Sequence, residues 1–399
     1  MRQSVARGEF TMVRNPFSKT VIGDDEPLCN QKSLLSALLL EARSGNNNVL
    51  LAPRRCGKTS LAMRLARDYR AECGLATFCD LSAVPSADAA ADRIATALYA
   101  SLSVNDKIFK KLSQLVTAFV PVITMNPDGS FSVSASASGL AKSGLDRLVS
   151  VVASLDSISS HSKTPLLVIF DEFQDLAMLN NGAQIEAALR STIQHHKASY
   201  LFIGSRRKLL RDMFDSPKRA FYRGATTRVL PLIEPDEFST HLVALAKESG
   251  AIWPRNITDN IIAIAEAHTY SVTAIAHVLY ESTAPNVPTE DDLAEAVNTA
   301  VARETSLFTS VYASLSPQSR TLVEVLAREP TRQPMSGEYM ARNKLTTAAT
   351  VKKSLVALIN GDHIAKDESG LITLTDPLLK RWLNERWGKQ HMISMPTLG

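Results

Sequence analysis

The feature that most constrains this chain is a short apolar run that leads into Gly57-Lys58-Thr59. The run, Val49 to Ala52, predicts a buried strand, and apolar residues at helical spacing from Leu61 onward predict an amphipathic helix. A tight loop between a strand and a helix N-terminus presents backbone N–H groups that can cradle phosphate. We therefore expect a phosphate-binding loop here. Its residues are Pro53, Arg54, Arg55, Cys56, Gly57, Lys58, Thr59 and Ser60.

One position departs from the usual pattern G-x-x-x-x-G-K-[ST], because Ala52 stands in place of the first glycine. The second glycine, Gly57, which lies beside the phosphates in this pattern, is present. The lysine of the pattern, here Lys58, reaches the β- and γ-phosphate oxygens, and the hydroxyl of Thr59 coordinates Mg²⁺. Because Gly-Lys-Thr alone also occurs by chance, the interpretation depends on the strand before it and the helix after it.

A second stretch, Leu166 to Glu172, is a run of five apolar residues that ends in two carboxylates. The centre of a parallel sheet requires fully apolar strands, and acids at their carboxyl ends lie where ligands bind in open α/β sheets. We expect Asp171 to hold Mg²⁺ and Glu172 to orient or deprotonate an attacking water. The alternative is a core strand that happens to meet a charged loop. Together with the phosphate-binding loop, the stretch predicts an enzyme that binds ATP with Mg²⁺ and hydrolyses it.

A third apolar stretch, Tyr200 to Ile203, predicts a strand shortly before Ser205 and Arg206. In P-loop ATPases of this topology, that strand lies next to the phosphate-binding loop, and a polar residue at its tip can sense the γ-phosphate. Ser205 and Arg206 are the candidate sensors, and Arg206 joins Lys58 and Glu172 as a candidate catalytic residue. The alternative for Arg206 is a basic helix start on the surface.

The segment 206–228 holds eight basic residues against two acids. Some of these could act as an arginine finger toward a neighbouring subunit's nucleotide, and others could contact DNA phosphates. A solvated basic surface explains the segment almost as well.

Composition limits the classes of protein that this chain can belong to. Its 399 residues are enough for two or three domains, 45% are hydrophobic and 21% charged, and the net charge of +4 permits an acidic partner without requiring one. No apolar run approaches the about 18 residues of a membrane span, and Met1 to Met12 has no signal-peptide core. The four cysteines show no zinc-site spacing. We therefore expect a cytoplasmic protein with no membrane partner.

Pattern changes along the chain predict a division into domains. A helical pattern follows Pro235, and a Pro-Asp-Gly turn between two alternating segments predicts a hairpin inserted into the core. The expected divisions are a flexible leader at 1–15, the ATPase core at 16–234 with the hairpin at about 121–137, a helical lid at 235–308, a C-terminal domain at 309–388 and a tail at 389–399.

The sequence of the C-terminal domain predicts three helices followed by a hairpin, which is the pattern of a winged helix. The third helix, from Ala348 to Asn360, carries two lysines near its start. The candidate DNA-binding residues are Thr347, Thr350, Lys352 and Lys353, which could meet phosphates or base edges. The alternative is a regulatory winged helix that docks protein.

The order of these motifs resembles the archaeal-type ATPases, which are related to STAND switch ATPases and to the AAA+ origin-recognition initiators. The matching pieces are Asn15-Pro16-Phe17, Pro53 to Leu61, Phe170-Asp171-Glu172-Phe173-Gln174, Ile203-Gly204-Ser205, Met213-Phe214, Ala220-Phe221-Tyr222, Leu230-Pro231-Leu232 and Asp376 to Leu383. The resemblance implies an α/β fold: an AAA+-like parallel sheet core with a P-loop, a helical lid and a C-terminal winged helix. It also implies the site roles given above, with Arg206 as the arginine of the sensor strand.

Two segments depart from that family. The lead-in reads Leu28-Cys29-Asn30-Gln31 where the family usually carries an arginine, and the lid reads His268-Thr269-Tyr270-Ser271 where the family usually has a Gly-x-Pro turn. The lid also lacks the arginine that many AAA+ lids use.

The leading hypothesis is an ATP-dependent molecular switch that binds ATP and ADP, whose nucleotide state moves the winged helix, with double-stranded DNA as the expected partner. A second hypothesis is a STAND-type signalling or defence scaffold that changes oligomeric state, as a homo-oligomer or with a protein partner. A third is a transposition or replication accessory ATPase.

Overall fold

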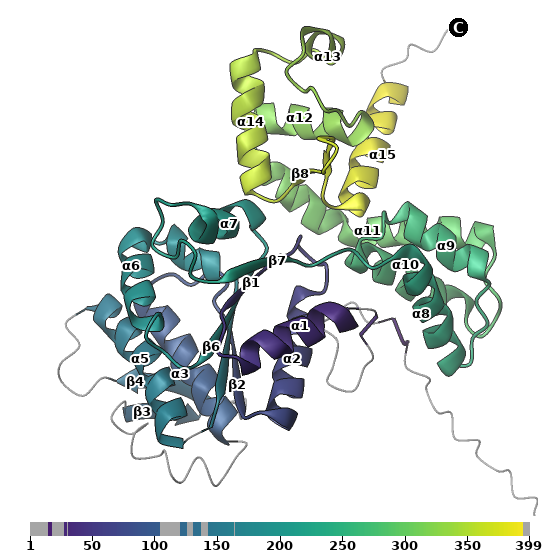
Figure 1. Cartoon of the computed structure of the whole chain (residues 1–399). Helices are drawn as coiled ribbons and strands as arrows, with labels where there is room; N and C mark the ends of the chain where they lie inside the picture. Colours follow the sequence, from purple (N-terminus) through teal and green to yellow (C-terminus); the bar gives the residue numbers. More distant parts are fainter. Residues whose placement is uncertain are drawn as a thin grey trace, which may run out of the picture. The chain divides into compact units, whose positions relative to one another are not determined.

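The computed structural model describes residues 15–17, 28–29, 31–103, 120–125, 131–136, 143–162 and 164–393. The chain forms two compact units (Figure 1). One unit comprises Ile22–Pro231 with Pro317–Thr375, and the other comprises Met1–Val21, Leu232–Ser316 and Asp376–Gly399. The leader expected at 1–15 lies outside the described residues except for Asn15.

A five-stranded parallel sheet forms the centre of the first unit, with the strand order β2-β5-β6-β1-β7. The strands are β1 (Asn48–Leu51), β2 (Leu75–Asp80), β5 (Leu166–Asp171), β6 (Ser199–Gly204) and β7 (Thr226–Val229). Every residue of β1, β5 and β6 is buried. This burial explains why these strands are almost entirely apolar, since helices cover a parallel sheet on both faces.

Alternate residues of the strands enter two separate cores, one on each face of the sheet. Leu50 and Ile169 pack with the helices α1 (Lys32–Arg43) and α2 (Lys58–Glu72). Val49 and Phe170 pack on the opposite face, where the remaining helices of the core gather (Figure 1). These are α3 (Ala87–Ser103), α5 (Gly144–Ser162), α6 (Gly182–Ile193) and α7 (Arg207–Asp215).

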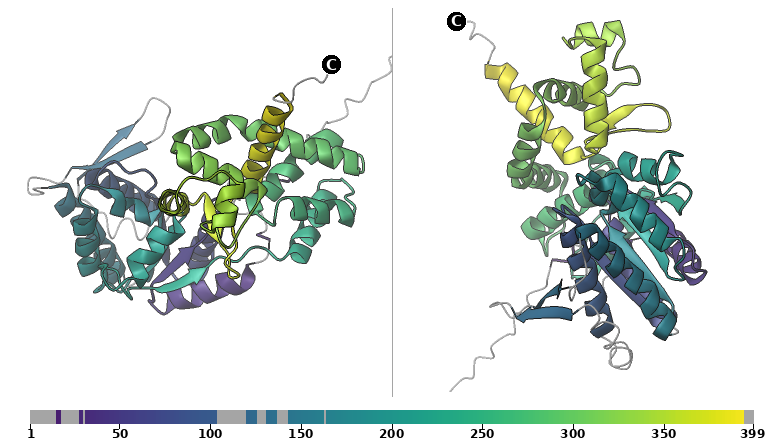
Figure 2. Two further views of the ribbon diagram at one scale, coloured as in Figure 1. Left: turned by 90° about the horizontal axis from the view of Figure 1, so that it is seen from above. Right: turned by 90° about the vertical axis from the view of Figure 1, so that its left-hand side faces the viewer.

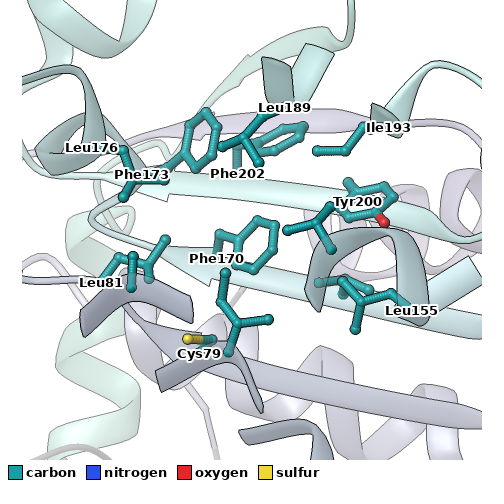
Figure 3. Packing of buried hydrophobic residues seen from close by; sticks show 14 of the residues in the cluster. Cys79, Leu81, Leu155, Phe170, Phe173, Leu176, Leu189, Ile193, Tyr200 and Phe202 are labelled. Carbon is teal, nitrogen blue, oxygen red and sulfur yellow. The ribbon is translucent and has the colours of Figure 1, made fainter. Parts of the chain in front are cut away.

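Aromatic side chains in the second of these cores fix the segment that follows β5. This segment, the 3₁₀ helix η1 (Phe173–Met178), places Phe173 against Phe202 of β6, with the ring centroids 4.6 Å apart (Figure 3). Both side chains are fully buried. Because Phe173 directly follows Glu172, this packing fixes the backbone at Glu172, the residue that follows β5.

The inserted hairpin has its two expected strands, β3 (Val120–Met125) and β4 (Phe131–Ser136). They pair antiparallel and form a two-stranded sheet separate from the central one (Figure 2). The expected turn between them, Asn126 to Gly129, lies outside the described residues.

The second unit is helical over its described residues. Its helices are α8 (Pro235–Glu248), α9 (Arg255–Ile264), α10 (Thr269–Thr283), α11 (Glu290–Ser314) and α15 (Pro377–Ile393). Helix α11 runs without a break through residues 308 and 309, because no glycine or proline interrupts it before Pro317. The N-terminal residue Phe17 belongs to this unit, where it is buried and stacks on Trp253 with the centroids 4.6 Å apart.

The turn before α10 contains two residues with unusual backbone angles. Glu266 and Ala267 both adopt positive φ angles, 49° and 55°, which are uncommon for residues other than glycine. The buried His268 then caps α10 by accepting the backbone N–H of Ser271.

The C-terminal region contains the helices and hairpin of a winged helix. The three helices are α12 (Pro317–Arg328), α13 (Gly337–Arg342) and α14 (Ala348–Asn360), and the wing is formed by β8 (Ile364–Lys366) and β9 (Ile372–Leu374), which pair antiparallel. Helix α15 follows and extends to Ile393, into the segment expected as a tail. None of the helices in the described ranges is long and apolar enough to cross a membrane.

Candidate functional site

Three neighbouring strands bring the predicted site residues to one edge of the sheet. Strand β6 pairs with β1 on one side and with β5 on the other, and all three run parallel. Their carboxyl ends therefore lie together. The phosphate-binding loop follows β1, Glu172 follows β5, and Ser205 follows β6.

Within the phosphate-binding loop, the residue before helix α2 is a glycine with a left-handed backbone. Gly57 has φ +82° and is the N-cap of α2, so the helix begins at Lys58. Arg55 also adopts a positive φ of 60°. Ala52 is fully buried and is not among the residues with positive φ. The first glycine of the usual pattern is thus not needed here for backbone conformation, whereas Gly57 is.

The lysine, the threonine and both carboxylates of the prediction lie in contact. Lys58 Nζ is 2.7 Å from Glu172 Oε1 and 3.9 Å from Asp171 Oδ1. The Thr59 hydroxyl donates a hydrogen bond of 2.8 Å to Asp171 Oδ2. One ammonium group therefore balances two carboxylates that are both largely buried, with side chains 7% and 17% exposed.

Burial and charge act in opposite directions on the two carboxyl groups. Burial alone would raise the pKa of Glu172, but the Lys58 ammonium and hydrogen bonds from Lys58, Gln174 and Ser205 lower that pKa to about 2. Burial raises the pKa of Asp171, and Lys58, which is more distant from it, offsets this only in part. Glu172 is thus the group that carries a firmly held negative charge.

Glu172 is also held by its backbone and by the next strand. Its φ of +51° is unusual for a residue with a side chain, and such backbone strain concentrates at functional sites. Its Oε2 atom accepts hydrogen bonds from the backbone N–H of Ser205 at 3.1 Å and from the Ser205 hydroxyl at 2.9 Å. Ser205 therefore contacts the candidate catalytic carboxylate directly, and its role as a γ-phosphate sensor stays a prediction.

Gln174 is also part of the site, although no role was predicted for it from the sequence. Its Nε2 atom donates a 2.6 Å hydrogen bond to Glu172 Oε2, and its side chain is fully buried. A polar residue between Phe173 and Leu176, two positions after Glu172, is the sequence signal that could have pointed to it.

Arg206 does not join the cluster of Lys58, Thr59, Asp171 and Glu172. Its guanidinium group meets the sulfur of Met178 at the end of η1. Within the described part of the chain, no ion pair joins Arg206 to Glu172. The catalytic and sensor roles of Arg206 stay predictions.

Three of the eight basic residues of segment 206–228 form ion pairs within the fold. Arg219 pairs with Glu186, Arg228 pairs with Glu41, and Arg207 pairs with an acid of the winged helix. These three arginines therefore have structural partners and do not form a simple solvated surface.

The acid that pairs with Arg207 is Asp362, which follows α14 and belongs to the same compact unit. Its Oδ1 atom accepts a 3.0 Å hydrogen bond from Arg207 Nε, and its Oδ2 atom accepts the backbone N–H of Arg54 at 3.2 Å. The residue is 4% exposed and has φ +57°. Burial raises the pKa of Asp362, while Arg207 and Arg54 favour its charged form. A carboxylate of the winged helix thus accepts a hydrogen bond from a backbone N–H group of the phosphate-binding loop.

The candidate DNA-binding residues lie at the start of α14. Thr347 is the N-cap, and its hydroxyl accepts the backbone N–H of Thr350 at 3.2 Å. Lys352 and Lys353 are exposed on the first turns of the helix. Thr347 therefore caps the helix with its side chain, whereas Thr350 contributes its backbone N–H to that cap, and their contact with DNA stays a prediction.

The site suits Mg²⁺ held partly by a nucleotide. Among the described residues, no group of three or more His, Cys, Asp or Glu side chains could hold a metal ion. Mg²⁺ commonly uses one or two protein oxygens and completes its shell with phosphate oxygens and water. The adjacent oxygens of Thr59 and Asp171 fit that arrangement, and their role as ligands stays a prediction.

Comparisons with known proteins confirm the fold class. A model of a family described as a probable winged helix domain matches residues 306–385. The Walker-type ATPase of Pyrococcus abyssi is similar with a TM-score of 0.68 and 14% identity, over 92% of this chain and 99% of that one. The ORC2 protein of Aeropyrum pernix, in its ADPNP-ADP complexes, is similar with a TM-score of 0.55 and 16% identity, over 95% of this chain and 98% of that one. No curated protein sequence matches this chain.

At such low identity the likeness is one of fold. The chain thus has the fold class that the resemblance implied: a parallel sheet core between helices, a following group of helices and a C-terminal winged helix.

We expect Lys58→Met to destabilise the nucleotide-free protein by about 3 kcal/mol, because it leaves two buried carboxylates without their cation. Adding Glu172→Gln to this variant removes one of the negative charges and should restore a large part of the loss. Urea unfolding of the single and double variants at neutral pH measures this effect. Strictly additive losses would contradict the charge balance described here.

Proposed function

We propose that this chain is a molecular switch that binds and hydrolyses ATP. Its nucleotide state controls the winged helix, and the protein acts on or with double-stranded DNA. The observation that carries the proposal is the cluster of Lys58, Thr59, Asp171 and Glu172 at the carboxyl edge of the sheet, directly after a glycine with positive φ. Phosphate binding at a helix N-terminus and two carboxylates beside it are the parts that ATP hydrolysis requires.

In this proposal, the lysine changes partner when ATP binds. The β- and γ-phosphates carry more negative charge than a single carboxylate, so Lys58 turns from Glu172 Oε1 to the phosphate oxygens. The freed oxygen of Glu172 then accepts a hydrogen bond from the attacking water, and later its proton. Thr59 and Asp171 would hold Mg²⁺, which would supply positive charge to balance the phosphate groups.

Substitutions of Lys58 and Glu172 should affect different quantities, the first ATP affinity and the second the hydrolysis rate. Lys58→Ala removes a phosphate contact, so we expect ATP affinity to fall by about tenfold or more. Glu172→Gln keeps the shape of the side chain but removes the base and the charge that competes with ATP for Lys58, so we expect ATP affinity to be equal or higher and the hydrolysis rate to fall by about 10²- to 10⁴-fold. Calorimetric titration with ATP and steady-state phosphate release measure the two effects. Unchanged ATP affinity of Lys58→Ala would refute the site assignment.

The switch part of the proposal is supported by the contact of Asp362. This carboxylate already accepts an N–H group of the phosphate-binding loop, at Arg54. Phosphates bound in the same loop add negative charge close to a second, buried negative charge, and like charges disfavour each other strongly at low dielectric. ATP binding and the Asp362 contact should therefore oppose each other, and such coupling is reciprocal.

We expect Asp362→Asn to raise ATP affinity, because it removes the opposing charge and weakens the contact with Arg207. A coupling of about 1–3 kcal/mol corresponds to an increase of about 5- to 150-fold. Asparagine tolerates the positive φ at this position, so misfolding should not complicate the result. Arg219→Gln, which breaks the ion pair with Glu186, is the matched control and should leave ATP affinity unchanged. Equal ATP affinity of Asp362→Asn and wild type would exclude the coupling.

The DNA part of the proposal rests on the winged helix and on the exposed lysines of α14. Lysines near a helix N-terminus that enters a groove can contact phosphates, and each such contact makes binding more sensitive to salt. Thr347 and Thr350 at the start of the same helix can reach phosphate or base edges.

We expect salt-dependent binding to duplex DNA, with a salt slope that falls by about 1 for each lysine removed from Lys352 and Lys353. The matched control is Lys32→Ala/Lys247→Ala, which removes two exposed lysines from α1 and α8. Fluorescence anisotropy at several salt concentrations measures the slopes. No DNA affinity, together with a change in oligomeric state on ATP binding, would overturn this part and favour the signalling scaffold.

A further inference from the structure

A buried amide lies behind the candidate catalytic carboxylate. Gln174 is fully buried, and its Nε2 atom donates to Glu172 Oε2 at 2.6 Å and to Asp175 Oδ1 at 3.2 Å. Both partners are carboxylates, which accept hydrogen bonds and do not donate them when ionised. The orientation of the amide is therefore determined, because the opposite orientation would direct its oxygen at two negative groups.

The oxygen of the same amide is buried without a hydrogen-bond partner among the described residues. Such unsatisfied groups are rare in proteins, and each one calls for an explanation. Methionine would fill a similar volume without this cost, so packing alone does not account for a glutamine here. The hydrogen bond that its N–H group makes to Glu172 does.

The end of β6 is shaped to admit this amide. A Cβ atom at Gly204 would collide with Gln174 Oε1 and lie 2.9 Å from Gln174 Cδ. Gly204 directly precedes Ser205, which holds the same oxygen of Glu172 through its N–H and its hydroxyl. Glu172 Oε2 is thus held from two elements, η1 and the end of β6, and a glycine lets them approach.

A further contact fixes Gln174 in turn. Asp175 Oδ2 accepts the backbone N–H of Ala83 at 2.8 Å, in the loop after β2. The hydrogen bonds therefore continue from Glu172 through Gln174 and Asp175 to the loop that follows the neighbouring strand β2.

We propose that Gln174 is a positioning residue that holds Glu172 Oε2 in place, so that Oε1 stays fixed while it exchanges its contact with Lys58 for one with the attacking water. The inference rests on the ATP hydrolysis proposed above. Gln174 fixes the carboxylate while the lysine leaves it, and a carboxylate that can rotate no longer meets the water in a reactive geometry. Among the described residues, the hydrogen bonds of Gln174 go to Glu172 and Asp175 and none goes to the phosphate-binding loop, so nucleotide binding should not depend on Gln174.

The test is a comparison of kcat with KM in Gln174→Met, which keeps the volume but removes the hydrogen-bond donor. We expect kcat to fall by about 10- to 100-fold, while KM and the measured affinity for ATP stay within about twofold of wild type. Gln174→Glu, of the same shape, should lose activity as well, because it places a third carboxyl group between Glu172 and Asp175. A merely structural role would lower the melting temperature and would not produce this split.

A double-mutant cycle with Gly204 tests the contact itself. We expect Gly204→Ala to lower kcat in the wild-type chain, because its Cβ displaces the Gln174 amide. In a Gln174→Ala chain the side chain that would be displaced is absent, so Gly204→Ala should cause little further loss. Additive losses in kcat would contradict the proposed arrangement.

Wild type and Glu172→Gln are measured in parallel, which separates this inference from the proposal on which it rests. Hydrolysis by wild type that Glu172→Gln abolishes, together with unchanged kcat in Gln174→Met, overturns the positioning role alone. Equal rates for wild type and Glu172→Gln overturn both proposals. Loss of kcat with preserved ATP affinity in Gln174→Met and Gln174→Glu supports the positioning role.

Discussion

The site depends on one lysine that balances two buried carboxylates. Lys58 contacts Glu172 directly and lies farther from Asp171, and all three side chains are largely shielded from water. Burying two carboxylates together is unfavourable unless a cation accompanies them. A nucleotide that attracts the lysine must therefore change the state of both acids, and this gives nucleotide binding a direct effect on the group proposed to carry out hydrolysis.

The winged helix also contributes a buried carboxylate that requires a positive partner. Asp362 brings a further buried carboxylate to the phosphate-binding loop, where it is balanced by Arg207 and by the N–H group of Arg54. The site thus contains several negative groups that compete for a few donors. When a phosphate group accepts a hydrogen bond from one of these donors, the carboxylate that held the donor loses it. Phosphate binding can therefore change contacts between residues that are far apart in the sequence.

Much of the fold follows from local patterns. The apolar runs before Lys58, at the start of the Leu166 segment and around Leu201 became three adjacent buried strands, because a parallel sheet covered on both faces accepts little else. The contact of Lys58, Thr59, Asp171 and Glu172 followed from the same patterns, since parallel strands place their carboxyl ends together. The roles of Arg206 and of the lysines of α14 could not be decided in this way, because they depend on partners that bind from outside.

The sequence by itself determined the order of strands and helices, the loop that ends at Gly57 and the acids that end β5, because each of these is encoded in a short stretch of chain. Only the tertiary structure decided that Gln174 holds Glu172 beside Gly204, and that Asp362 accepts an N–H group 308 residues away. Gln174 and Glu172 lie two positions apart, but the contacts of Gln174 with Gly204 and of Asp362 with Arg54 join segments that are distant in the sequence and share no pattern. They exist because packing excludes water and leaves each buried polar group to the partner that the fold brings near it.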